Sequence, residues 1–223
     1  MDNHTSRSTI ERQQFMPKAK FSPDFTRKRY NRIAFLYDLM EAPMERLRFT
    51  SWRQKLTGRI AGPTALEVGV GTGKNLIFYP DELNITAIDL SPRMLERARK
   101  RANKLNLNVN LQEMDVQHLN FADDSFDTVF ATFVFCSVPD PVAGLQELRR
   151  VCKPDGKLLL LEHMRPENFV LGLIFDLFNP VIVRMMGANI NRRTINNIRQ
   201  AGWQIKTEEC LSSDIVRMIE AAP

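Results

Sequence analysis

The sequence predicts an α/β protein built around a doubly wound, mostly parallel β-sheet with helices on both faces. From residue 64 to about residue 165, short apolar runs that end in an acidic or polar residue alternate with helix-like stretches. This alternation is typical of strand–helix–strand units. The run 126–135 is almost continuously apolar, as expected for a central strand that is buried on both faces. Such sheets bind ligands at the carboxyl ends of their strands, so we expect the site there.

Length and composition fit one globular domain. The chain has 223 residues, of which 43% are hydrophobic and 26% charged. Its net charge of +5 is uneven, because residues 1–60 contain 13 Lys/Arg and 6 Asp/Glu. This basic part could face an anionic membrane or nucleic acid, or could be a solvated helix face. Three cysteines without metal-binding spacing and the absence of a signal peptide favour a cytoplasmic protein without a metal site.

The N-terminal quarter is expected to lie outside the sheet. Residues 1–24 are polar and aperiodic, and we expect a tail. Residues 25–40 and 44–60 show helical spacing of apolar side chains and are separated by Pro43. We expect two helices over 25–60 that form a lid on a core of residues 61–223.

The core elements follow in order. We expect strands at 64–68, 84–89, 109–114, 126–135, 157–162, 202–205 and 215–219. Helices are expected after the first glycine-rich loop at 74–79, then after Ser91, at 141–152 and at 191–201, with Ser91 and Asp140 as N-caps. The apolar segment 168–183 contains Asp176 and Asn179 and is too short to span a bilayer. It could line an acceptor pocket, lie at a membrane surface, or pack on the sheet or on a second subunit.

A glycine-rich loop follows the first predicted strand, with the spacing Glu67-x-Gly69-x-Gly71-x-Gly73. Glycines allow a tight turn and let a ligand approach the backbone closely. The dinucleotide fingerprint would need a glycine at the sixth position from Gly69, but that position is Lys74. The spacing instead resembles the first motif of class I S-adenosylmethionine (SAM) methyltransferases.

Other stretches extend this resemblance over residues 30 to about 165. The chain is similar to the UbiE-like (ubiquinone/menaquinone-type) group in residues 30–38, 89–95, 125–127 and 150–156. Residues 135–139 and the pair Glu162-His163 look closer to membrane-associated thiol methyltransferases and to bacterial phospholipid N-methyltransferases. The resemblance implies a Rossmann-like, seven-stranded sheet whose last strand is antiparallel, with SAM as cofactor and S-adenosylhomocysteine as product.

The resemblance also implies cofactor-binding roles at matching positions. Asp89 would accept hydrogen bonds from both ribose hydroxyls, because a carboxylate has two oxygens. Asp115 and the backbone of Val116 would bind the adenine ring. The other implied cofactor residues lie in the glycine loop, beside the adenine, or at the methionine end: Glu67, Gly69, Gly71, Gly73, Leu90, Met94, Ala131 and Thr132. Each acid could instead be a helix or turn cap.

Catalysis requires mainly alignment of the acceptor with the activated methyl group. His163 is the candidate general base because histidine titrates near neutrality. Tyr37 is the candidate lid residue over the methionine end, and either side chain could simply be structural. The expected acceptor is a small hydrophobic or lipid-like molecule: a quinone, a phospholipid amine or a thiol, reached by a cytoplasmic protein that can associate peripherally with a membrane.

Two other functions stay open at this point. A nucleic-acid methyltransferase is suggested by the basic N-terminal part, but residues 137–140 read Ser-Val-Pro-Asp rather than the motif that is associated with base amino groups. The sequence also lacks interleaved aromatic and basic residues, so no nucleic-acid partner is expected. A SAM-binding regulatory protein without catalysis would keep the same binding motifs.

Overall fold

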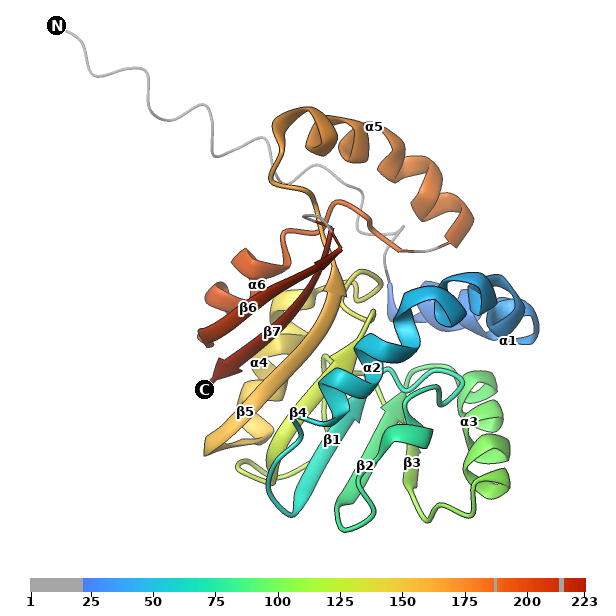
Figure 1. Ribbon diagram of the computed structural model, residues 1–223, viewed down its shortest axis with the longest axis vertical. Coiled ribbons are helices and arrows are strands. Elements are labelled where there is room, and N and C mark those ends of the chain that lie inside the picture. The colour runs from blue at the N-terminus through green and yellow to red at the C-terminus, as the bar shows by residue number, and fades with distance from the viewer. Residues whose placement is uncertain (1–21, 187, 213–214) are drawn as a thin grey trace, which may run out of the picture.

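The computed structural model describes residues 22–186, 188–212 and 215–223, so the expected tail at 1–24 lies outside it except for residues 22–24. Seven strands form one sheet: β1 (Thr64–Val68), β2 (Asn84–Asp89), β3 (Asn110–Glu113), β4 (Phe126–Thr132), β5 (Cys152–His163), β6 (Gln204–Ser212) and β7 (Val216–Ala222). Their order is β3-β2-β1-β4-β5-β7-β6 (Figure 1). β1 to β5 run parallel, and β7 is antiparallel to both of its neighbours. The predicted doubly wound sheet with an antiparallel last strand is confirmed.

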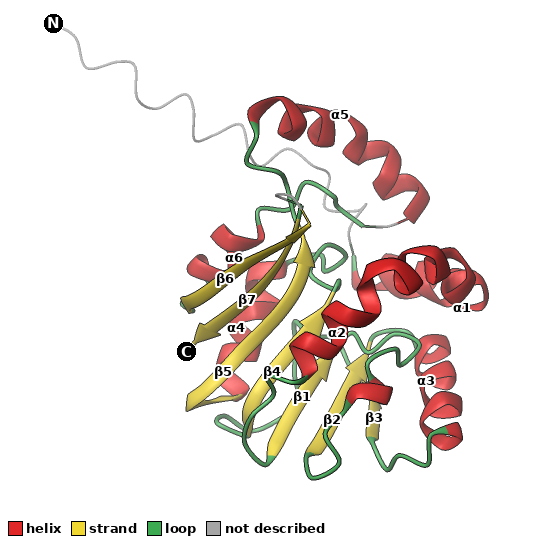
Figure 2. Cartoon of the chain, in the orientation of Figure 1, coloured by secondary structure: helices red, strands yellow, loops and turns green. Residues whose placement is uncertain are grey.

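Helices cover both faces of this sheet (Figure 2). α4 (Pro141–Val151) and α6 (Thr194–Gln200) lie on one face, and α2 (Thr50–Thr57) and α3 (Pro92–Lys104) lie on the other. The alternation along β5 shows why. Leu158 and Leu160 pack with α4 and α6, whereas Leu159 and Leu161 pack with Leu56 of α2. Both faces are therefore dry, as the apolar strands predicted.

The N-terminal helices differ in detail from the prediction. α1 (Pro23–Met44) runs through Pro43 instead of ending there, and a π-helical turn, η3 (Glu45–Phe49), joins it directly to α2. Proline has no N–H and removes one helical hydrogen bond, so the irregularity follows Pro43 as a widened turn rather than a break.

The helix expected at 74–79 is only a short 3₁₀ turn, η4 (Leu76–Phe78). Pro80 follows Tyr79, and a residue before proline disfavours the helical conformation. The two expected N-caps are confirmed. Ser91 Oγ accepts from the Met94 N–H at 3.2 Å, and Asp140 Oδ1 accepts from the Ala143 N–H at 3.0 Å.

The apolar segment forms a separate helix, α5 (Phe169–Met186), that stands off the carboxyl-end edge of the sheet (Figure 1). The crossover that covers the sheet between β5 and β6 is α6 instead. Among the described helices, none combines the length and apolar character needed to cross a bilayer.

Candidate functional site

A cleft of about 750 Å³, including its open mouth, lies at the carboxyl ends of β1, β2 and β4. Its walls come from α1, the glycine loop, the end of β2 with the start of α3, the segment after β3, and the segment after β4. The residues used below are Tyr30, Tyr37, Gly69, Gly71, Asp89, Leu90, Met94, Asp115, Val116, Thr132, Phe133 and Ser137.

Three glycines shape the loop for different reasons. Gly69, Gly71 and Gly73 have φ angles of +66°, +57° and +80°, which side-chain-bearing residues rarely adopt. A Cβ on Gly69 would meet Val134 at 2.4 Å, and one on Gly73 would meet Leu76 at 2.5 Å, so both allow close packing. A Cβ on Gly71 would have no neighbour nearer than 3.9 Å. The space beside Gly71 is therefore open to the cleft.

Asp89 is the last residue of β2, and its carboxylate fixes the glycine loop. Its Oδ2 accepts from the Gly71 N–H and its Oδ1 from the Ser91 N–H, each at 2.8 Å. Burial raises the pKa of Asp89 to about 6, although these two hydrogen bonds favour the ionised form. Each carboxylate oxygen keeps a further lone pair, so the group can still accept two hydrogen bonds from a ligand.

Asp115 lies beside Asp89 in the cleft, directly after β3. Gln117 fixes it, because the Gln117 backbone N–H donates to Asp115 Oδ1 at 3.0 Å and the Gln117 amide donates to both carboxylate oxygens. Leu90, Met94 and Val116 line the same part of the cleft. The combination is an apolar part of the cleft with a carboxylate acceptor in its lining.

α1 closes over the cleft and contacts the segment after β4. Tyr30 OH and Ser137 Oγ are 2.6 Å apart, and the rings of Tyr30 and Tyr37 have centroids 6.2 Å apart. Phe133, the first residue of that segment, has φ +57°, a strained conformation for a phenylalanine. The two consecutive N–H groups of Val134 and Phe135 both donate to Glu162 Oε1, at 2.8 and 2.9 Å. Glu162, in β5, thus fixes the strained segment that follows β4.

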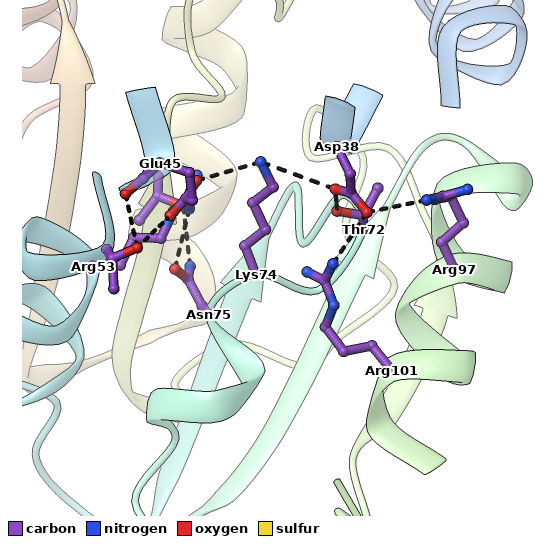
Figure 3. A network of polar contacts seen from close by, with 10 residues as sticks. Asp38, Glu45, Arg53, Thr72, Lys74, Asn75, Arg97 and Arg101 are labelled. Carbon is purple, nitrogen blue, oxygen red and sulfur yellow. Dashed lines mark hydrogen bonds and ion pairs between the residues drawn. The ribbon is translucent and has the colours of Figure 1, made fainter. Parts of the chain in front are cut away.

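A second set of contacts joins α1 to the glycine loop and to α3 (Figure 3). Asp38 accepts from Thr72 Oγ1 at 2.6 Å and forms ion pairs with Arg97 and Arg101, each at 3.1 Å. Lys74 lies 3.3 Å from Glu45 Oε2 and 3.9 Å from Asp38 Oδ1. Partial burial works to raise the pKa of Asp38, but the hydrogen bonds from Thr72 and Arg97 outweigh it and keep the pKa below its usual range.

The network continues into the core. Arg53 donates to Thr132 Oγ1 at 2.7 Å and to Asn75 Oδ1 at 3.1 Å, and the Asn75 amide donates to Glu67 at 2.6 Å. The Tyr79 hydroxyl donates to the other oxygen of Glu67. Burial raises the pKa of Glu67 to about 7 despite these donors.

The structure brings nine of the thirteen predicted site residues to the cleft. They are Tyr37, Gly69, Gly71, Asp89, Leu90, Met94, Asp115, Val116 and Thr132. Glu67, Gly73, Ala131 and His163 do not line it. Glu67 is buried and accepts from the Asn75 amide just after the glycine loop, and Ala131 is fully buried in the sheet.

His163 lies behind the cleft wall. Its ring stacks on Phe133, with centroids 6.1 Å apart, and its Nε2 is buried without a partner among the described residues. Burial lowers its pKa to about 4, so the ring stays neutral rather than titrating near neutrality. As a base it would reach the cleft only if Phe133 moved.

Sequence reasoning missed several residues of the site. Tyr30 and Asp38 lie in the resembling stretch 30–38 and Ser137 lies in 135–139, but the resemblance implies no role for these three residues. Arg53 and Thr72 had no signal of their own. Their contacts join elements that are distant in the chain, so only tertiary structure reveals them.

Comparisons with known proteins agree with this architecture. Residues 66–160 match a family described as a methyltransferase domain. Demethylmenaquinone methyltransferase of Lactobacillus johnsonii is 33% identical over 175 residues, which cover 73% of this chain and 71% of that protein. Phosphatidylethanolamine N-methyltransferase of Cereibacter sphaeroides is 40% identical over 115 residues, but these cover 51% of this chain and only 57% of that protein.

Solved structures support the fold. Geranyl diphosphate C-methyltransferase from Streptomyces coelicolor, solved with S-adenosyl-L-homocysteine, superposes with a TM-score of 0.66 at 14% identity, covering 78% of this chain and 79% of that one. A SAM-dependent methyltransferase from Thermotoga maritima gives a TM-score of 0.64 at 23% identity, covering 87% and 98%. By its sequence relatives and its fold, the chain belongs to the class I SAM-dependent methyltransferases, in the UbiE-like group.

Proposed function

We propose that the protein binds SAM in this cleft and transfers its methyl group to a lipid-like acceptor. One observation carries the cofactor site: the open side of Gly71 faces a cleft in which Asp89 keeps free acceptor capacity. A ribose diol offers two donors to such a carboxylate. The cleft lining also contains the apolar side chains and the carboxylate acceptor that an adenine ring needs.

The remaining residues have assigned places in this proposal. Leu90, Met94 and Val116 pack on the adenine, and Asp115 accepts from its amino group. The methionine end lies toward Gly69, Thr132 and Tyr37, at the carboxyl ends of β1 and β4. Glu67, Gly73 and Ala131 act indirectly, by holding the loop and the end of β4 in shape.

SAM supplies an activated methyl group, so this chain has to position the acceptor and exclude water. α1 does both, because Tyr30 and Tyr37 close one side of the cleft. We therefore propose residues 25–60 as a lid on the SAM-binding core at 61–223. A general base is needed only for an acceptor atom that still carries its proton, and His163 has that role only after a movement of Phe133.

Several features favour a hydrophobic acceptor. The wall of the cleft after β4 contains Phe133, Val134, Val138 and Pro139. The two relatives named above act, by their names, on a menaquinone precursor and on a phospholipid amine. A quinone or phospholipid is held in a membrane, so we expect the protein to work at a membrane surface.

The test has a binding arm and a transfer arm. Calorimetry should give micromolar SAM affinity and little NAD affinity; comparable NAD binding would contradict the cofactor assignment. Labelled SAM is then incubated with vesicles containing a demethylated quinol or phosphatidylethanolamine, and separately with an alkyl thiol, using Asp89→Ala as the inactive control. SAM binding without transfer to any of the three would favour a regulatory protein over this enzyme.

A further inference from the structure

The helix α5 has its polar side chains toward the protein and its apolar side chains toward solvent. Asp176 pairs with Arg165 at 2.9 Å and accepts from the Asn191 amide at 3.0 Å. Asn179 is only 4% exposed, and its side-chain oxygen accepts from the Ile190 N–H at 3.0 Å. A surface helix of a water-soluble protein normally has the opposite arrangement.

The outward side of α5 is strongly apolar. Six of its side chains are between 50% and 74% exposed: Phe169, Val170, Leu173, Leu177, Phe178 and Val181. Polar contacts fix the opposite side of α5 against the protein, so the helix cannot rotate about its axis to bury these apolar residues. An apolar surface that is held outward in this way fits an apolar environment.

α1 presents a second exposed stripe. Phe35 and Leu39 are 80% and 72% exposed, and Lys28 and Arg32 are exposed on the same side at helical spacing. Exposed aromatic and aliphatic side chains together with basic ones are typical of helices that lie in the interface of an anionic membrane. Long basic side chains can then reach the lipid phosphates.

The two stripes belong to neighbouring helices. The Arg29 guanidinium of α1 donates to the carbonyl oxygen of Arg184, in the last turn of α5, at 2.6 Å. Both helices lie at the carboxyl-end edge of the sheet (Figure 1). The cleft lies at the same edge, and Tyr30 of α1 lines it.

We propose that α1 and α5 together form a docking surface for an anionic lipid bilayer, with both helices lying in the plane of its interface. A bilayer suits this surface better than a second copy of the chain. In a two-fold interface centred on α1, Lys28 and Arg32 would lie close to the same residues of the copy, and these like charges would repel. Docking through α1 would place the cleft within about one helix diameter, ~10 Å, of the lipid. The proposal depends on the proposed function only for its purpose, which is access to a membrane-held acceptor.

Vesicle sedimentation tests the proposal directly. We expect the full chain to bind vesicles of phosphatidylcholine with phosphatidylglycerol, to release at high salt, and to bind pure phosphatidylcholine weakly. Lys28→Gln with Arg32→Gln should weaken binding about 25-fold, because each basic residue near an anionic surface contributes about fivefold. Leu173→Gln with Leu177→Gln should also release the protein. These residues are exposed, so the variants should fold.

Matched controls are available on other surfaces. Ile77→Gln changes an apolar side chain that is 63% exposed outside both helices, and Lys206→Gln removes an exposed charge on β6. Both should bind vesicles like the unchanged protein. The proposal is overturned if the protein stays in the supernatant at low salt, or if the helix variants bind like the controls. It is also overturned if the chain forms a dimer in solution that the α5 variant abolishes.

A separate measurement keeps the two proposals distinguishable. Calorimetry with SAM on the docking variants should give unchanged affinity, because the substituted side chains do not line the cleft. If the docking variants lose vesicle binding but keep their SAM affinity, the docking surface is supported and the cofactor assignment is untouched. Asp89→Ala should lose SAM affinity but still bind vesicles.

Discussion

Replacing Asp89 gives the sharpest test of the cofactor site. Asp89→Ala removes the carboxylate that accepts from the Gly71 N–H of the glycine loop, and with it the proposed acceptor of the ribose hydroxyls. Hydrogen bonds to a charged group contribute about 1.5–3 kcal/mol. The dissociation constant for SAM should therefore rise roughly 10- to 150-fold. Calorimetry at pH 8 measures this change.

The same carboxylate predicts a pH dependence. The pKa of Asp89 is raised to about 6, and the ionised form is the one that accepts two hydroxyl donors. Affinity should then be constant above pH 7 and fall as pH drops below about 6, by up to tenfold per unit. The Ala variant has no such group, so its weaker affinity should be flat over this range and the two curves should approach each other at pH 5.

A matched control removes an acid elsewhere on the same side of the sheet. Glu96 lies on α3, is exposed, and pairs with Lys100 at 2.6 Å. Glu96→Ala should leave both the affinity and its pH profile unchanged. If Asp89→Ala binds SAM normally, Asp89 is not the ribose acid. If Asp89→Ala binds SAM weakly and its affinity still falls below pH 6, another group titrates. Glu67, whose pKa is raised to about 7, is then the candidate.

Two further predictions concern stability and the lid. Burial raises the pKa of Glu162 from 4.5 to about 7, so the unfolded chain loses its proton first as pH rises, and stability is lost between those values. Glu162→Gln removes this effect. As pH rises from 4.5 to 8, the unfolding free energy of the unchanged protein should fall by about 3 kcal/mol relative to that of the variant, as measured by urea denaturation. An equal loss of stability with pH in both would contradict the buried carboxyl. Asp38→Ala should speed hydrogen exchange over residues 30–38 about fivefold, because surface ion pairs contribute up to about 1 kcal/mol. Asp24→Ala is the control, and equal protection of residues 30–38 in both variants would argue against Asp38 holding α1 over the cleft.

The sheet could be predicted from sequence because its signals are local. Apolar runs, acids at strand ends, and the caps Ser91 and Asp140 each act within a few residues, so each expected strand overlaps a strand of the structure. The ends are less exact: the strand expected at 157–162 is β5 (Cys152–His163), and the strand expected at 202–205 is β6 (Gln204–Ser212). The glycine loop could be predicted for the same reason. Its three glycines have positive φ, and only glycine adopts that conformation readily.

The placement of single side chains could not be predicted as well. Glu67 and His163 sit at strand positions, and the alternation of strand side chains decides which face each one meets. A strand end near a site therefore says nothing about whether its last side chain points into the cleft. The prediction of a helix at 74–79 was wrong for a different reason. Pro80 limits the helical stretch to the single turn η4.

The proposed lid role of α1 depends on what holds this helix in place. Among its described side chains only Ala34 is fully buried, so apolar packing contributes little to its position. Its contacts are mainly polar: Tyr30 with Ser137, and Asp38 with Thr72, Arg97 and Arg101. Ion pairs whose members keep a quarter or more of their surface exposed contribute little net free energy each, and salt weakens them. α1 can therefore open at small cost while the sheet stays folded, which is the property that a cofactor lid needs.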